Sequence, residues 1–587
     1  MTGRASSPPS PESLASARAL QEGVGHARNG HLAVAMASFR KAIELDHHNY
    51  SAHFNLALAF DRTGDLPTAA RQFGLMAQRF DDPSLKTRAL NQAARVLDGL
   101  REYDKAHAAL RQSLEINPHQ RDALQDIVHI RQAGCIWPVI EPFGQVTSEA
   151  LVNAMEPLGL LAHSDDPALQ LVINARYATR PGIQESAVRG AAVRSGDRLR
   201  IGYLSADFRD HATSHLMRDV PELHDRTKVE VTCYYSGPEV IDPLQDHFRS
   251  CSDMFVDISK LDDGTASRRI REDAIDILID LNVHTRHSRS GILAHRPAPI
   301  IVNWLGFPGT AGSPYHHYIL ADEWTIPPGE EKYFSERVLR LPCYQPNPRQ
   351  RRTSNTTQRR ADSGLPDQGF VFCCFNGLWK ITPASFARWM QILQAVEDSV
   401  LWLISGPAEL QKRLEREAEA CGVSASRLVF ADWRRNEEHL ARYKLADLFL
   451  DTGPYGAHTT SADALWMGVP VITISGRSFA SRVCGSLVRS AGLPDLVFAE
   501  PQDFVAQAIA IAKTPERLEG YRVRLAAARD SCVLFNTAHL VRHLENLYEE
   551  MWRHLVAGEL PQPGLNLLTA GSSTEALRAR AAISADG

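Results

Sequence analysis

Apolar residues in the last two thirds of the chain come in short runs, separated by longer stretches with helical periodicity. This alternation is typical of parallel strands that are covered by helices on both faces. It stops near residue 343, gives way to the polar segment 344–368, and resumes at Phe370. The pattern therefore predicts two Rossmann-like α/β lobes in series. The expected strands are residues 199–204, 229–235, 275–281 and 300–305 in the first lobe, and 370–375, 400–405, 427–432, 445–451 and 469–475 in the second.

The N-terminal third of the chain has a different period. Small and aromatic positions recur 34 residues apart, and a third, degenerate unit follows at an offset of 37. The spacing resembles that of the tetratricopeptide repeat, a helical hairpin in which alanines let the helices approach closely. An array of such hairpins presents a concave surface to extended peptides, where Asn55 and Asn91 either bind a peptide backbone or are solvated. The recurring positions are Gly30, Ala35 and Phe39, then Gly64, Ala69 and Phe73, then Ala106 and Leu110.

Together the patterns predict an α-helical repeat array followed by two α/β lobes. The five arginines of the segment 344–368 are interpreted as a solvated surface, with an acidic partner as the alternative. An amphipathic helix at 538–556 is expected to pack across the lobes. The expected segments are a disordered N-terminus (1–14), the repeat array (15–134), a helical linker (135–197), the N-terminal lobe (198–343), an interlobe linker (344–368), the C-terminal lobe (369–560) and a disordered tail (561–587).

Composition and charge limit the classes of function. The 587 residues are 44% hydrophobic and 23% charged, as in ordinary globular proteins, and the net charge of −5 argues against a nucleic-acid partner. The nine cysteines include no CxxC pair, which favours a reducing compartment. The N-terminus has no apolar signal-peptide core, and the sequence has no apolar run long enough to cross a membrane. We therefore expect a cytoplasmic protein with neither a nucleic-acid partner nor a membrane partner.

A candidate phosphate site lies within residues 445–475. The predicted strand ends at Asp451, a loop with glycine and proline follows, and residues 458–461 open a helix with hydroxyl side chains. A helix N-terminus that follows the carboxyl end of a strand offers free backbone N–H groups to a phosphate. The alternative is an ordinary strand–helix–strand unit with a good N-cap.

The sequence predicts no metal site, because it contains no P-loop, no HExxH and no Asp-x-Asp motif. A diphosphate would then be neutralised by cations and helix dipoles. Lys380 lies at a strand-to-helix junction, and His439 and Arg442 lie three residues apart on one helical face. In the first lobe His211 follows a strand, where it is either a general base or a structural hydrogen-bonding group. His215 lies four residues further on, but no third metal ligand is evident beside this pair.

Five long motifs follow one another in the two lobes: GYLSADFRDHATSHLM, RPAPIIVNWLGFPGTAGSPYHHYILAD, CFNGLWKITP, SVLWLISGP and LADLFLDTGPYGAHTTSADALWMGVPVITISGRSFASRV. In this order they resemble the nucleocytoplasmic O-linked N-acetylglucosamine transferases. The resemblance extends from Arg198 to Ala557 and includes the repeat region. It implies tetratricopeptide repeats joined to a two-lobed, metal-independent, inverting glycosyltransferase of the GT-B type.

The resemblance also implies roles for individual residues. His211 corresponds to the proposed proton acceptor, and Lys380 to the lysine that stabilises the departing nucleoside diphosphate. Two positions depart from the family pattern, since Gly377 replaces a glutamine and Asn436 replaces a lysine, and both changes weaken side-chain contacts to the donor. The other implied donor contacts are His439 and Arg442 at the nucleobase, His458, Thr459 and Thr460 at the diphosphate, and Asp463 near the ribose and sugar.

The function implied by the resemblance is protein O-glycosylation without a cofactor. We expect metal-independent, inverting transfer of N-acetylglucosamine from UDP-GlcNAc, the co-substrate, to Ser or Thr of proteins or peptides that bind through the repeat groove and the cleft. Because Gly377 and Asn436 alter the donor contacts, a protein glycosyltransferase that uses GDP-fucose or another nucleotide sugar is one alternative. A non-catalytic repeat scaffold is the other.

Overall fold

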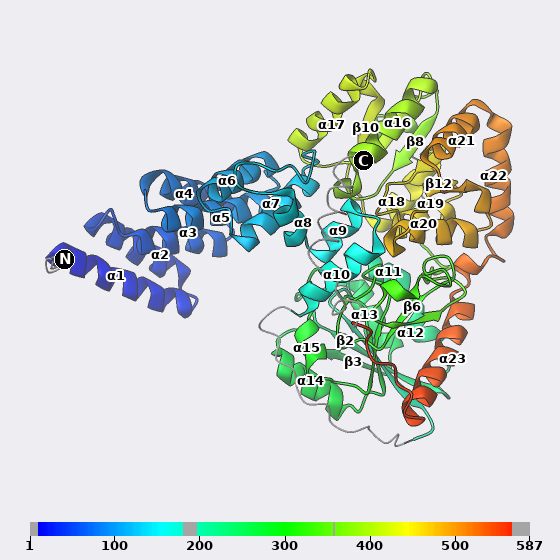
Figure 1. Ribbon diagram of the computed structural model, residues 1–587, viewed down its shortest axis with the longest axis horizontal. Helices are drawn as coiled ribbons and strands as arrows, with labels where there is room; N and C mark the ends of the chain where they lie inside the picture. Colours follow the sequence, from blue (N-terminus) through cyan, green and yellow to red (C-terminus); the bar gives the residue numbers. More distant parts are fainter. Residues whose placement is uncertain (1–9, 180–195, 356–357, 566–587) are drawn as a thin grey trace. The chain divides into compact units, whose positions relative to one another are not determined.

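The computed structural model describes residues 10–179, 196–355 and 358–565. The chain divides into two compact units, Met1–Met155 and Glu156–Gly587 (Figure 1). The boundary falls inside the predicted helical linker 135–197, of which residues 180–195 lie outside the described residues. The helices of this linker are α8 (Ser148–Ala154) in the first unit, and α9 (Pro157–His163) and α10 (Pro167–Ala178) in the second.

The first unit is a stack of helical hairpins, as the repeat pattern predicts. Each helix packs against the next one along the chain. Phe39 and Phe73 are almost fully buried between the helices, as are the alanines at the recurring positions. The helices are α1 (Pro11–Arg28), α2 (Leu32–Leu45), α3 (Tyr50–Arg62), α4 (Leu66–Arg79), α5 (Pro83–Gly99), α6 (Tyr103–Ile116) and α7 (Arg121–Ala133).

Glycines close the first two hairpins. Gly30 and Gly64 lie in the turns with φ of 80° and 82°, a backbone region that other L residues rarely adopt. In the third hairpin the corresponding position is Arg101, with φ of 58°. The third unit is therefore degenerate in its turn as well as in its spacing, at a cost of about 1 kcal/mol.

Helix α1 begins earlier than the sequence predicts. It starts at Pro11 and is capped by Ser10, whose hydroxyl accepts a hydrogen bond from the backbone N–H of Ser13 at 3.1 Å. Residues 11–14 are therefore helical, and the prediction of disorder is wrong for them. The predictions of disorder for residues 1–9 and 566–587 lie outside the described residues. In the described part of the predicted tail, 561–565, the backbone N–H of Gly564 donates to the carbonyl of Ser335 at 2.6 Å.

Asn55 and Asn91 both form hydrogen bonds within the array. The amide of Asn91 donates to Gln120 Oε1 at 2.9 Å and accepts from Ser113 Oγ at 2.6 Å. Asn55 Nδ2 donates to the backbone carbonyl of Ser51 at 2.8 Å. Asn91 thus links neighbouring helices of the array, a role that neither sequence interpretation included.

The second unit contains two parallel sheets. In its described residues the first sheet has seven strands, in the order β3-β2-β1-β4-β5-β6-β7. The apolar pattern predicts four of them and misses β3, β6 and β7, which are short and lie at or next to the sheet edges. The strands are β1 (Leu199–Ser205), β2 (Val229–Tyr235), β3 (Met254–Asp257), β4 (Ile277–Asp280), β5 (Ile300–Asn303), β6 (Tyr318–Ala321) and β7 (Arg337–Arg340).

The second sheet has six strands in the described residues, in the order β10-β9-β8-β11-β12-β13. All five strands predicted for this lobe are present, and β13 is additional. In both sheets the strand order reverses in the middle, between β1 and β4 and between β8 and β11, and α/β proteins bind ligands at the carboxyl ends of the strands there. The strands are β8 (Val371–Cys374), β9 (Val400–Ile404), β10 (Leu428–Ala431), β11 (Leu448–Leu450), β12 (Val471–Ile474) and β13 (Val497–Phe498).

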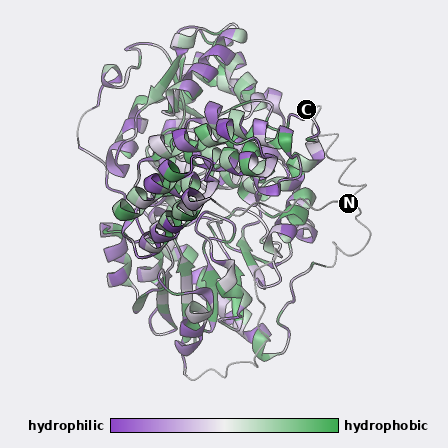
Figure 2. Cartoon of the chain, turned by 90° about the vertical axis from the view of Figure 1, so that its left-hand side faces the viewer, coloured by the Kyte–Doolittle hydropathy of each residue, from purple (hydrophilic) through white to green (hydrophobic). Residues whose placement is uncertain are grey.

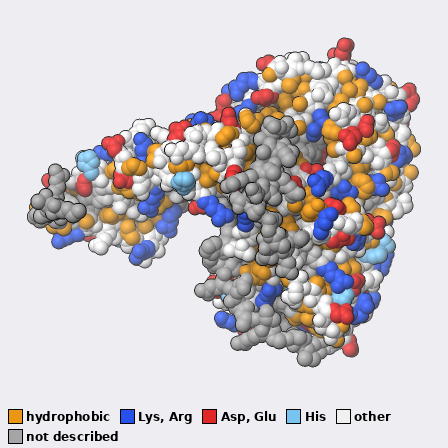
Figure 3. All heavy atoms as spheres, in the orientation of Figure 1, with side chains coloured by type: hydrophobic (Ala, Val, Ile, Leu, Met, Phe, Trp, Pro, Cys, Tyr) orange, Lys and Arg blue, Asp and Glu red, His pale blue; other side chains and the backbone are white. Residues whose placement is uncertain are grey.

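Helices pack around both sheets (Figure 1). The strands are mostly hydrophobic, whereas the helices carry hydrophobic and hydrophilic residues side by side (Figure 2). On the face of the molecule in Figure 3, Lys and Arg side chains are interspersed with Asp and Glu. Among the described residues, no helix has the length and apolarity needed to span a bilayer. The first-lobe helices are α11 (Ala212–Met217), α12 (Val220–Leu223), α13 (Pro243–Cys251), α14 (Asp263–Glu272) and α15 (Ser290–Ala294). They are followed by α16 (Pro383–Ala395), α17 (Ala408–Ala420), α18 (Asn436–Arg442), α19 (Thr459–Trp466), α20 (Phe479–Ser490), α21 (Pro501–Lys513), α22 (Pro515–Ala528) and α23 (Thr537–Val556).

The segment between the lobes is buried where it begins. Tyr344 and Asn347 are at most 1% exposed. The Tyr344 hydroxyl donates to the backbone carbonyl of Leu305 at 2.7 Å, and Arg349 Nε donates to that of Phe535 at 2.6 Å. The prediction of a solvated surface loop is therefore wrong for this part of the segment, because its polar groups bond to both lobes.

Helix α23 returns to the first lobe, where it packs on α12 and β5 (Figure 1). The hydroxyls of Tyr548 and Tyr203 lie 2.9 Å apart, and Glu545 Oε1 lies 3.0 Å from His224 Nδ1. The contacts of α23 are thus made with the first lobe, although its position in the sequence assigns it to the C-terminal lobe.

Candidate active site

The candidate site in the second lobe lies where β8 and β11 end. Asn376 follows β8, and its Nδ2 donates to Asp451 Oδ1 at 3.2 Å and to Thr452 Oγ1 at 2.8 Å. The side-chain oxygen Oδ1 of Asn376 accepts a hydrogen bond from the Thr460 hydroxyl in the first turn of α19. Asp451 also accepts from the backbone N–H of Ala457 at 2.7 Å. This network holds the loop between β11 and α19, so that the first turn of α19 faces the end of the sheet.

Lys380 reaches into this loop from the strand-to-helix junction after β8. Its Nζ donates to the carbonyl of Gly456 at 3.1 Å and lies 3.5 Å from the ring centroid of Tyr455. Burial lowers the pKa of Lys380 to about 8, and the charge of Asp451 acts in the opposite direction. No other group in the described residues bonds to the ammonium, which leaves N–H groups for a ligand.

His458 stands at the N-terminus of α19, beside the same tyrosine. The ring centroids of His458 and Tyr455 are 5.1 Å apart. Burial lowers the pKa of His458 well below its ordinary value, and the charge of Lys380 lowers it further, so the imidazole is neutral. Its Nε2 atom is buried without a hydrogen-bond partner in the part of the chain that the structure describes. Thr459, the first residue of α19, is partly exposed. A cation, a neutral imidazole and a helix N-terminus therefore converge on one small volume.

Asp463 pairs with Arg351, a residue of the interlobe segment that the sequence interpretation treated as solvated. The two side chains form an ion pair and are 5% and 6% exposed, respectively. Within the described residues, Arg351 Nη1 has no hydrogen-bond partner. Nothing in the sequence pattern distinguishes Arg351 from its neighbouring arginines, because its burial depends on the path of the chain between the lobes.

His439 and Arg442 lie together on α18, as their spacing predicts. The His439 ring packs against Phe375 and Tyr443, each with ring centroids 5.3 Å apart. Burial lowers the pKa of His439 to about 4, and the charge of Asp463 opposes this shift. Arg442 Nη1 donates to a backbone carbonyl at 2.8 Å, and its residue lines a pocket of about 470 Å³. That pocket, with an aromatic wall and two arginines, is lined by Trp402, Phe430, Asp432, Arg434, Glu438 and Arg442, among others.

In the first lobe His211 caps the N-terminus of α11. Its Nδ1 accepts a hydrogen bond from the backbone N–H of Thr213 at 3.3 Å and lies 3.7 Å from Asp207 Oδ2. Burial lowers the pKa of His211, and the charge of Asp207 acts in the opposite direction. His215 bonds instead to Asp210, with Nε2 and Oδ1 2.8 Å apart. The described residues contain no group of three metal-ligating side chains.

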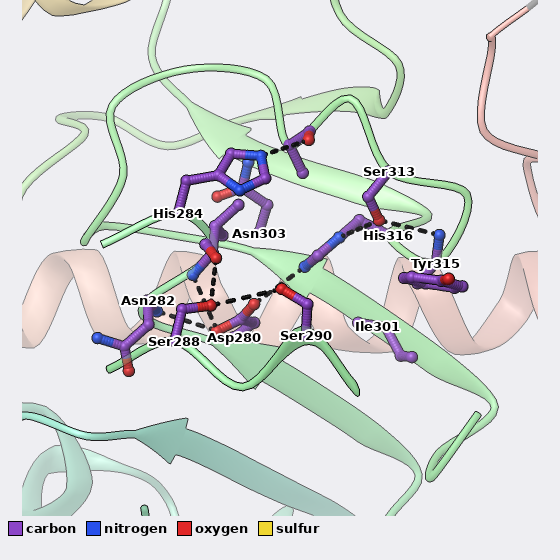
Figure 4. Close-up of polar contacts among 12 residues, drawn as sticks. Asp280, Asn282, His284, Ser288, Ser290, Ile301, Asn303, Ser313, Tyr315 and His316 are labelled. Carbon is purple, nitrogen blue, oxygen red and sulfur yellow. Dashed lines mark hydrogen bonds and ion pairs between the residues drawn. The ribbon is translucent and has the colours of Figure 1, made fainter. Parts of the chain in front are cut away.

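A polar network lies beneath His211, where β1 and β4 end. Asn282 donates to Asp207 Oδ2 at 2.7 Å and accepts from the backbone N–H of Ala206 at 2.7 Å. Its own backbone N–H donates to Asp280, whose other oxygen lies 3.2 Å from His316 Nε2 (Figure 4). Asp207 and Asn282 were not predicted as site residues, although both follow adjacent strands, β1 and β4, at their carboxyl ends. The network fixes the carboxylate that faces His211.

The first and second lobes meet where α11 lies against α19. A pocket of about 680 Å³, here called the interlobe pocket, is lined by residues of both lobes and of the segment between them. Its residues are Asp210, His215, Arg218, Ile241, Asp242, Pro243, Leu244, His247, Pro348, Gln350, Arg351, Arg352, Trp433, Arg435, Asn436 and Glu437. The arrangement suits transfer of a group from an anionic leaving group: Lys380 and the N-terminus of α19 offer positive charge, and His211 caps α11, the helix that contacts α19.

Comparison with known proteins agrees with this arrangement. Residues 185–344 and 348–544 match the model of Glycosyl transferase family 41, and residues 87–120 match a tetratricopeptide-repeat model. A probable UDP-N-acetylglucosamine–peptide N-acetylglucosaminyltransferase, SEC, from Arabidopsis thaliana is 35% identical over 462 residues, which cover 74% of this chain and 47% of the relative. A UDP-N-acetylglucosamine–peptide N-acetylglucosaminyltransferase from Caenorhabditis elegans is 29% identical over 480 residues, covering 62% and 42%. The chain thus spans about half the length of the curated relatives it matches.

Among solved structures, a mutant of the O-GlcNAc transferase from Thermobaculum terrenum is similar over nearly all of both chains. The TM-score is 0.68 with 27% identity, and the match covers 93% of this chain and 98% of the other. The predicted architecture, a tetratricopeptide array followed by two Rossmann-like lobes of the GT-B type, is confirmed, and so is the resemblance to the O-linked N-acetylglucosamine transferases. Since the family model matches more than half of its residues, the chain belongs to glycosyl transferase family 41.

Proposed function

We propose that the protein transfers N-acetylglucosamine from UDP-GlcNAc to Ser or Thr side chains of proteins, with inversion and without a metal ion. The observation that carries the proposal is the grouping of Lys380, neutral His458 and the N-terminus of α19 across from His211. The activity in the names of the plant and nematode relatives supports the same donor and acceptor. The donor and the protein acceptor are the only partners proposed.

The donor diphosphate would lie at the first turn of α19. Its charge grows as the bond to the sugar breaks, and Lys380 and the N–H groups of Thr459 and Thr460 are the donors available. In enzymes of known mechanism, one such preorganised donor contributes about 3–4 kcal/mol to stabilising the transition state. The position of Lys380 at the loop before α19 is the reason for assigning it the largest share.

The nucleoside would lie towards α18. His439 and Arg442 would hold the base, and Asp463 would contact the ribose. Asp463 is already paired with Arg351, so its negative charge is neutralised beside the helix N-terminus that takes the diphosphate. Arg351 thereby removes a net negative charge from the side of the site where the family lysine is replaced by Asn436.

The acceptor hydroxyl would approach from the side of His211. The acceptor oxygen forms a bond to the sugar carbon while the bond to the diphosphate breaks, and the hydroxyl proton leaves for a base or for water. Because Nδ1 of His211 accepts from Thr213, the proton of the neutral imidazole is on Nε2, which then donates. This geometry favours His211 as a group that orients the acceptor. A shift of the ring towards Asp207 would place the proton on Nδ1 and free Nε2 as a base.

The donor sugar has a second candidate, supported by the residue at the position of the family glutamine. A Cβ atom at Gly377 would lie 2.7 Å from Trp379 Nε1, so the Trp379 ring occupies the space that a glutamine side chain would enter. Trp379 also contacts Tyr455, with ring centroids 5.3 Å apart. The donor site beside Lys380 therefore differs from the family pattern. Another nucleotide sugar, such as GDP-fucose, is the alternative donor.

A transfer assay tests the proposal. The purified protein is incubated with radiolabelled UDP-GlcNAc, UDP-glucose or GDP-fucose and with protein acceptors. We expect label from UDP-GlcNAc on Ser or Thr, loss of transfer in Lys380→Met, and full transfer in Lys444→Met, which changes an exposed lysine of the same lobe. Label from GDP-fucose instead would select the alternative donor, and UDP binding without any transfer would indicate a non-catalytic scaffold.

We also propose a cytoplasmic location. All nine cysteines are free, and six of them are buried, which fits the reducing compartment expected from the sequence. Fractionation of cells that express a tagged protein would test the location.

A further inference from the structure

We propose that the interlobe pocket binds acidic residues flanking the acceptor Ser or Thr, so that the enzyme selects protein segments with Asp or Glu beside the modified residue. The inference rests on the proposed function and adds the chemical class of the acceptor. Three features of the pocket support the inference: its arginines without ion pairs, its exposed apolar rim and its position next to His211.

The arginines without ion pairs are Arg218, Arg352 and Arg435, which line the pocket from the first lobe, the interlobe segment and the second lobe. Arg352 and Arg435 are exposed, and Arg218 is partly exposed. Within the described residues, none of the three guanidinium groups forms a hydrogen bond or an ion pair. A guanidinium group presents a planar set of N–H donors that matches a carboxylate, so an acidic side chain is the fitting ligand.

Most of the acidic groups of the pocket are already engaged by the protein. Asp210 bonds to His215 at 2.8 Å. Asp242 caps α13, where it accepts from the backbone N–H of Leu244 at 2.8 Å, and it also accepts from that of Asp210. Glu437 is the remaining carboxylate, against three unpaired arginines. The pocket is therefore cationic in a chain whose net charge is −5.

The rim of the pocket carries two large apolar side chains. Trp433 is 77% exposed, and Ile241 is fully exposed. They come from opposite lobes, after β10 and before α13. Exposed apolar side chains beside charged ones commonly mark a binding surface, and a Trp ring gives a rigid contact for a peptide backbone or an apolar side chain.

The pocket lies where an acceptor has to pass. Asp210 and His215 line it, and they flank His211, which is expected to meet the acceptor hydroxyl. Residues next to the modified Ser or Thr would therefore lie over the pocket while the hydroxyl reaches His211. The nucleotide sugar is the other anionic ligand nearby, and the experiment below separates the two.

The experiment uses two peptides with one Ser-containing core and different flanks, Asp and Glu in one, Asn and Gln in the other. Transfer kinetics and, with UDP present, direct binding by fluorescence anisotropy are measured for the full chain and for an Arg352→Glu/Arg435→Glu double variant. Arg416→Glu on α17 is the matched control, since Arg416 is also exposed on the second lobe but lies outside the pocket. We expect the acidic peptide to have a kcat/KM about tenfold higher in the unaltered protein and in the control. In the double variant the ratio should fall to one or below, and in the unaltered protein it should shrink as NaCl rises from about 0.05 M to about 0.5 M.

Equal kcat/KM and equal affinity for the two peptides in the unaltered protein would overturn the inference. A double variant that loses UDP affinity as much as peptide affinity would also overturn it, because the pocket would then serve the donor. Selective binding of the acidic peptide without any transfer would count against the proposed function and would leave the acidic-segment site standing.

Discussion

The charge of Lys380 should set the upper pH limit of activity. Its pKa falls from an ordinary value of 10.5 to about 8 because the side chain is buried, so the ammonium in the donor-free enzyme loses its proton above about pH 8. If the ammonium stabilises the leaving diphosphate, kcat/KM for the donor should fall about tenfold for each pH unit beyond that point. The alkaline fall of kcat should begin at a higher pH than that of kcat/KM. A bound diphosphate stabilises the charged lysine and raises its pKa again.

The same shift has a consequence for stability. The difference between 10.5 and about 8 corresponds to about 3 kcal/mol by which folding disfavours the ammonium. Between these two pH values the unfolded chain binds the proton and the folded chain does not, so the free energy of unfolding should rise with pH across that window. Below about pH 8 both states bind the proton, and the buried ammonium lowers the free energy of unfolding by the full amount, about 3 kcal/mol. Lys380→Met should therefore be inactive at neutral pH and yet unfold at a higher temperature than the unaltered protein when no donor is present.

The assay is donor kinetics from about pH 6 to about pH 10, paired with thermal unfolding of the same samples. Lys380→Arg is the control for charge, because a guanidinium group stays protonated throughout; its activity should be lower but without the alkaline limb. A kcat/KM that stays level to about pH 10, or a Lys380→Met variant that is less stable than the unaltered protein at neutral pH, would refute the reasoning.

Four further predictions follow from other parts of the molecule. Arg351→Met should weaken UDP binding about tenfold, because it leaves the Asp463 carboxylate buried and unneutralised; adding Asp463→Asn should restore part of the affinity, and calorimetric titration with UDP measures both, with Arg352→Met as the control. His211→Ala should lower transfer about 10²-fold or more while UDP affinity stays unchanged, and a drop in affinity instead would remove His211 from the acceptor side. Transfer should continue in excess EDTA and should not increase with Mn²⁺ if, as proposed, Lys380 and α19 supply the charge; full dependence on Mn²⁺ in a metal-reconstitution assay would contradict this. Arg101→Gly should stabilise the repeat array by about 1 kcal/mol, visible in denaturant unfolding of the full chain, because glycine adopts φ of 58° without strain; a destabilised array would mean that the Arg101 side chain matters more than its backbone.

The parts of the site that follow strands were predictable from the sequence. Lys380 comes after β8 and the His458 helix after β11, and adjacent parallel strands bring their carboxyl ends together. Arg351 was not predictable in this way, because its pairing with Asp463 depends on how a segment without regular strands crosses between the lobes. The missed strands β3 and β7 have another cause: they lie at sheet edges, where hydrophobic patterning is weak.

The return of α23 to the first lobe determines how the two lobes can move. The chain passes between the lobes twice, once through the segment after Tyr344 and once before α23, and the second passage is anchored by the buried Tyr203–Tyr548 and His224–Glu545 contacts. A body tethered at two points cannot swing freely about either one. Any opening of the cleft also has to break direct contacts between the lobes, in which Arg482 and Ser486 of α20 donate to the Trp324 carbonyl and to Asp322 of the first lobe. Deleting α23, rather than cutting the chain before it, would release the second passage and uncover apolar surface on the first lobe at the same time.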